Sequence, residues 1–60
     1  MIYRGPIRVG VYNSIGGWKA VIYDNDGPIQ TGIGAYDTKE GAQVEAREWA
    51  RSEGIQVDFE

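Results

Sequence analysis

The chain contains no cysteine and no histidine. Without cysteine it can form no disulfide, and it offers no thiolate to a zinc site. Without histidine it lacks the commonest general base and the commonest ligand of transition metals. These absences argue against Ser-His and Cys-His catalysis and against a structural zinc site.

Long hydrophobic runs are also missing. No apolar stretch approaches the roughly 20 residues that a membrane-spanning helix needs, and the first residues have no signal-peptide pattern. Sixty residues are enough for one small domain, spanning 1–60. We therefore expect a small, soluble, cytoplasmic domain with no membrane partner.

Positive charge is scarce. Six Lys and Arg residues face nine Asp and Glu residues, which gives a net charge of −3, and most of the acidic residues follow residue 36. This balance has the wrong sign for a protein held on nucleic acid by charge alone.

Motifs for chemistry are weak. The run from Asp24 to Gly27 begins like a calcium loop, but Pro28 follows it and Ala35 stands where the bidentate acid should be. Ser14 has no histidine to activate it. We therefore expect no enzymatic activity, no metal site, no cofactor and no small-molecule substrate.

Three segments alternate between apolar and polar residues with a period of two, which is typical of half-buried strands. They are 7–12, 18–23 and 29–36, and turn-forming residues such as Asp26-Gly27 separate them. The segment 1–6 is expected to be an extended lead-in, because Pro6 lacks a backbone donor. Residues 7–36 should therefore form a three-stranded antiparallel sheet.

The period changes after residue 36. Asp37 or Thr38 can cap a helix over 38–53, with Asp37 and Glu40 resembling a capping box, and Gly54 is a natural stop. Alternation over 55–59 predicts a short final strand. The predicted fold class is α+β: a three-stranded antiparallel meander packed on one helix, with a short C-terminal strand, in the order β-β-β-α-β.

One helix can cover only one face of such a sheet. The more apolar strand positions should lie beneath it, and Trp18 and Trp49 should fill the volume there. The expected covered positions are Ile7, Val9, Val11, Trp18, Ala20, Ile22, Ile29 and Ile33.

The opposite face is the candidate binding surface. Its tyrosines offer flat rings that stack and hydroxyls that form hydrogen bonds, although tyrosine also favours strands for purely structural reasons. The expected residues of this face are Arg8, Tyr12, Lys19, Val21, Tyr23, Gln30 and Tyr36. The first hypothesis is a non-enzymatic protein-interaction module that could pair with itself as a homodimer. The alternative is a nucleic-acid-binding module that uses the same face, which the acidic balance disfavours.

Three segments and two further alanines over residues 3–50 form a common pattern: Tyr3-Arg4-Gly5, Trp18-x-Ala20-x-Ile22-x-Asp24, Gly34-x-Tyr36-Asp37-Thr38-x-Glu40-x-Ala42, Ala46 and Ala50. This pattern resembles the AP2 domain and the related arm-binding domains of phage-type integrases. The resemblance implies a three-stranded sheet backed by a helix, with the open face in the DNA major groove and Arg8, Tyr12, Lys19, Tyr23 and Tyr36 as reading residues. This chain departs from that family in having two cations on the face, an acidic balance and an added final strand.

Overall fold

The computed structural model describes residues 5–60 of the chain. Most of the expected lead-in over 1–6, together with Tyr3 and Arg4, lies outside the described residues. Within them the element order is the predicted β-β-β-α-β. The elements are β1 (Arg8–Ser14), β2 (Gly17–Asp24), β3 (Gly27–Thr31), α1 (Lys39–Glu53) and β4 (Gln56–Val57).

The strands form one sheet in the order β3-β2-β1-β4. The expected antiparallel meander is confirmed for β1, β2 and β3. The short strand β4 pairs with β1 in parallel, so the sheet as a whole is mixed. The parallel pairing arises because α1 carries the chain back to the beginning of β1, where Val9 lies opposite Val57.

Two tight turns join the antiparallel strands. Ser14 pairs with Gly17 and Asp24 pairs with Gly27, so only two residues lie in each turn. The first strand therefore runs two residues further than the predicted 7–12. Gly17 has a φ of 125° and Gly27 a φ of 122°, values that other residues rarely adopt.

The third strand differs most from its prediction over 29–36. It contains one extra residue, Ile29, where the register with β2 shifts, and it ends at Thr31. The chain then leaves the sheet and returns at Tyr36, which exchanges backbone hydrogen bonds of 2.8 and 2.9 Å with Trp18. Ile29 is consequently 41% exposed and Ile33 97% exposed, so their predicted place in the core is wrong.

Helix α1 begins and ends close to the predicted bounds. Of the two candidate caps, Thr38 is the one used, and its hydroxyl accepts a hydrogen bond from the Gly41 N–H at 3.1 Å. Gly54 ends the helix in a left-handed conformation, with a φ of 71°. Residues next to the helix therefore provide hydrogen-bond partners for backbone groups at both of its ends.

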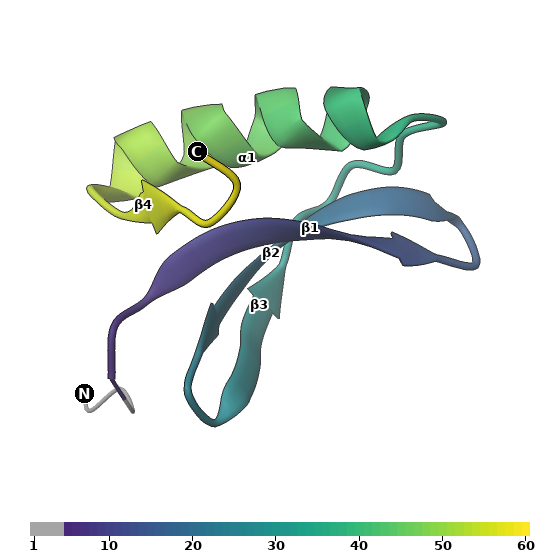
Figure 1. Cartoon of the computed structure of the whole chain (residues 1–60). Helices are drawn as coiled ribbons and strands as arrows, with labels where there is room; N and C mark the ends of the chain where they lie inside the picture. The colour runs from purple at the N-terminus through teal and green to yellow at the C-terminus, as the bar shows by residue number, and fades with distance from the viewer. Residues whose placement is uncertain (1–4) are drawn as a thin grey trace.

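The core lies between α1 and one face of the sheet (Figure 1). Its buried members are Val9, Ala20, Ile22, Ala46 and Ala50, and Val9 is the largest side chain that is fully buried. Trp49 packs against this cluster from the edge, whereas Trp18 is only half-buried and is not part of it. The expectation that two tryptophans fill the core is therefore confirmed for Trp49 and wrong for Trp18, because closely spaced alanines already bring the two layers together.

Candidate functional site

The pairing of β1 with β2 places five of the predicted residues on one face of the sheet. Arg8 lies opposite Tyr23, and Tyr12 lies opposite Lys19. Val21 lies between them, opposite Gly10. Cross-strand partners point to the same side, and these residues alternate with the buried Val9, Ala20 and Ile22. We call the face that carries Arg8, Tyr12, Lys19, Val21 and Tyr23 the open face.

Two predicted members lie elsewhere. Gln30 pairs with Ile22, so the extra residue in β3 turns it to the helix side, where it lines a hollow with Glu45 and Trp49. Tyr36 pairs with Trp18, also on the helix side. Hydrogen bonding to Glu45 raises the pKa of Tyr36, with burial and the charge of Glu45 acting in the same direction. Neither residue contributes to the open face.

The structure adds two residues of β3 in their place. Pro28 lies opposite Tyr23, and Thr31 lies opposite Val21. Together with Tyr12 and Val21 they line a shallow hollow of about 310 Å³. Sequence alternation could not find this hollow, because it depends on the register shift at Ile29.

The open face also receives Asp58, which the sequence reasoning missed. Its backbone N–H donates to the Val9 carbonyl at 2.9 Å, which fixes the chain after β4 beside β1. Its carboxylate accepts a hydrogen bond of 2.5 Å from the Tyr23 hydroxyl. A Cβ atom at Gly10 would lie 2.6 Å from the same carboxylate, so glycine there leaves room for it.

The electrostatics of this end of the face follow from that contact. The hydrogen bond to Asp58 is the main reason that the pKa of Tyr23 is raised, and burial and the negative charge of Asp58 add to it. Arg8 acts in the opposite direction. The face therefore carries both signs of charge: Arg8 and the Asp58 carboxylate both act on Tyr23, and Lys19 lies further along β2, opposite Tyr12.

The Ser14 hydroxyl donates to the Gly17 carbonyl at 2.8 Å, which ties the first turn. No group of three or more acidic, histidine or cysteine side chains among residues 5–60 is placed to hold a metal ion. In the same part of the chain, α1 is neither long enough nor apolar enough to cross a bilayer.

No protein-family model matches the chain, and neither a curated protein nor a solved structure matches it. The resemblance to AP2-like domains therefore stays a prediction.

Proposed function

We propose that this protein is a non-enzymatic interaction module that pairs with a second copy of itself through the open face. The observation that carries the proposal is the apolar hollow formed by Tyr12, Val21, Pro28 and Thr31 on a face that α1 does not cover. Tyr12 is 38% exposed at its rim, and a ring in that position buries a large area on contact at little entropic cost.

The thin core supports a second copy as the partner. Three of the five buried core residues are alanines, and the largest fully buried side chain is a valine. Domains of about this size often need a disulfide, a metal or oligomerisation for stability. The chain has no cysteine, so association is a physically reasonable source of further burial.

The charges of the open face suit pairing with an identical face. In a two-fold dimer the same surface meets itself, so cations of one copy can lie against anions of the other. Arg8 and Lys19 supply the cations, and Asp58 supplies the anion. The face thus complements itself more readily than a face of one sign would.

The outer edge of β3 is a poorer contact site than the face. Pro28 has no backbone N–H, and the register shift interrupts the strand. Both features discourage the addition of another strand at an edge. Face-to-face packing, in which two sheets meet across their side chains, is therefore the favoured mode.

Nucleic acid is the second candidate partner. Arg8 and Lys19 lie beside tyrosine rings, and bases can stack on such rings. Asp58 opposes this candidate, because its carboxylate would lie close to the phosphates. Two cations would give weak binding that depends steeply on salt.

Sedimentation equilibrium over a range of protein concentrations tests the proposal. Wild-type protein should shift from monomer to dimer, and a Tyr12→Ser/Tyr23→Ser variant should remain a monomer. Val44→Ser is the matched control, since Val44 is 55% exposed on the helix, away from the open face. It should dimerise as wild type does.

Two outcomes would reject self-pairing. In the first, wild-type protein stays monomeric at every concentration. In the second, the double tyrosine variant dimerises normally.

A parallel titration with mixed oligonucleotides tests the nucleic-acid alternative. Tight binding that falls steeply with added salt and is lost in the double variant would favour nucleic acid.

A further inference from the structure

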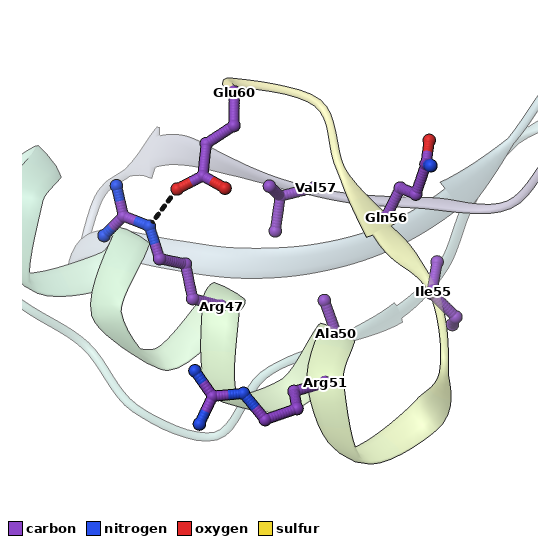
Figure 2. A pocket seen from close by; sticks show the side chains of 7 residues that line it. All are labelled: Arg47, Ala50, Arg51, Ile55, Gln56, Val57 and Glu60. Atoms are coloured by element: carbon purple, nitrogen blue, oxygen red, sulfur yellow. Dashed lines mark hydrogen bonds and ion pairs between the residues drawn. The ribbon is translucent and has the colours of Figure 1, made fainter.

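A groove lies on the other side of the domain, between the C-terminal half of α1 and the segment that contains β4 (Figure 2). Its volume is about 350 Å³. Two arginines of the helix form one wall, and four residues of the C-terminal segment, Ile55, Gln56, Val57 and Glu60, form the other. The lining residues are Arg47, Ala50, Arg51, Ile55, Gln56, Val57 and Glu60.

The first arginine already holds a carboxylate. The Nε atom of Arg47 donates to a carboxylate oxygen of Glu60, and the Arg47 guanidinium lies 5.2 Å from the centre of the Phe59 ring. Both side chains of the ion pair are accessible, at 44% and 54% exposed. Exposed pairs of this kind contribute little stability, so another carboxylate can compete for Arg47.

The second arginine lies one helical turn further along. Arg51 projects from the same side of α1 as Arg47 (Figure 2). Within residues 5–60, no ion pair joins Arg51 to an acidic side chain. Four residues of helix place the two positions about 6 Å apart along the axis. Side chains at positions i and i+2 of an extended peptide are separated by about 7 Å.

The opposite wall offers apolar surface and backbone. Ile55 and Val57 are half-buried beside Ala50. The Asp58 N–H points toward β1, and backbone N–H groups alternate in direction along a strand. The N–H and C=O of Val57 therefore point away from β1.

We infer that this groove binds an extended peptide segment with acidic side chains at alternate positions. The two carboxylates bind to Arg47 and Arg51, and apolar side chains between them lie against Ile55 and Val57. In the free protein the Glu60 carboxylate occupies the position beside Arg47. It must leave that position when a carboxylate of the peptide binds there. This site is separate from the open face and does not depend on dimerisation.

The test is an amide chemical-shift titration of the protein with acetyl-Val-Glu-Val-Glu-Val-amide. The amides of residues 47–51 and 55–60 should shift. Acetyl-Val-Glu-Glu-Val-Val-amide has the same charge but places its glutamates on opposite sides of an extended chain, so it should bind at least about fivefold more weakly. The peptide with both glutamates replaced by glutamine should not bind measurably.

Three protein variants complete the experiment. Arg51→Gln should weaken binding about tenfold. Lys39→Gln, which removes the same charge from the first turn of α1, should leave binding unchanged. Glu60→Gln should tighten binding about two- to fivefold, because it removes the competing carboxylate.

Repeating the titration in the Tyr12→Ser background separates the groove from the open face, because Tyr12 lines the hollow of that face and lines no part of the groove. The same result is expected there. The inference is overturned if the two glutamate peptides bind equally well, which would indicate unspecific charge attraction. It is also overturned if Glu60→Gln weakens binding, or if the shifted amides lie in β1 and β2.

Discussion

The two faces of the sheet are built from different kinds of side chain. Beneath α1, small residues meet: Ala20 packs with Ala46 and Ala50, next to Val9 and Ile22. On the open face, larger polar-tipped residues remain accessible, with Tyr12 and Tyr23 beside Arg8 and Lys19. Along β1 and β2, the residues that pack under α1 therefore alternate with residues that remain accessible on the open face.

This difference determines how the two layers pack. Alanines allow the helix to approach the sheet closely, but each of them buries little apolar area. The Tyr12 and Tyr23 rings lie on the opposite face and add nothing to this core. The comparison predicts that substitutions on the covered side affect folding and that substitutions on the open face affect association.

The largest expected effect comes from Gly17→Ala. The φ of Gly17 is 125°, and an added Cβ would lie 2.8 Å from the Tyr36 carbonyl oxygen, on the backbone that leads to α1. We expect the free energy of unfolding to fall by about 3 kcal/mol. Gly16→Ala is the neighbouring control, because no atom lies within 4 Å of a Cβ there, and it should change stability by less than about 0.5 kcal/mol. Urea unfolding measures the free energy of unfolding of both variants. An equal loss of stability in the two variants would contradict the close approach of Gly17 to Tyr36.

The most direct comparison of the faces uses two valines on neighbouring strands. Val9 is fully buried under α1, so Val9→Ala should lower the free energy of unfolding by about 2 kcal/mol. Val21 lines the hollow on the open face, so Val21→Ala should cost less than about 1 kcal/mol when measured on the monomer. If Val21→Ala destabilised the protein more than Val9→Ala, the assignment of the covered face and the open face would be wrong.

A smaller effect should appear in alkali. Tyr23 on the open face and Tyr36 on the covered side both have a pKa above 10.0 in the folded protein. The folded state thus holds these protons more strongly than the unfolded state does. The resulting stability is complete below pH 10 and is lost as the pH rises through the raised pKa values.

Phenylalanine variants separate the two tyrosines. Unfolding measured between about pH 9 and 11 should depend less on pH in Tyr23→Phe and in Tyr36→Phe than in wild type. Asp58→Asn should lower the pKa of Tyr23 alone, as followed by ultraviolet absorbance. A Tyr23 pKa that does not move in Asp58→Asn would contradict the contact between the two side chains.

The sequence predicted the parts of this domain that depend on local signals. Period-two alternation identified the paired strands, and Thr38 and Gly54 marked the ends of α1. Because Arg8, Tyr12, Lys19, Val21 and Tyr23 lie in regular antiparallel pairing, alternation alone placed them correctly on one face.

The misplaced residues depend on contacts between distant segments. One extra residue in β3 moved Gln30 to the other side, and no local signal marks it. The predicted strand is interrupted before Tyr36, where Gly32 and Gly34 lie close to the Glu45 carboxylate of α1, and Tyr36 returns to the sheet opposite Trp18. Asp58 reaches the open face only because β4 pairs in parallel with β1, and alternation over 55–59 does not give a direction.

We propose that the open face, rather than the helix, is the surface through which this protein associates. Valine methyl resonances test it most directly, because Val21 lies on the open face and Val44 lies exposed on α1. Spectra should be recorded as the protein is concentrated. We predict that the Val21 methyls shift and broaden while those of Val44 stay unchanged. Shifts at Val44 with an unchanged Val21 would contradict the claim.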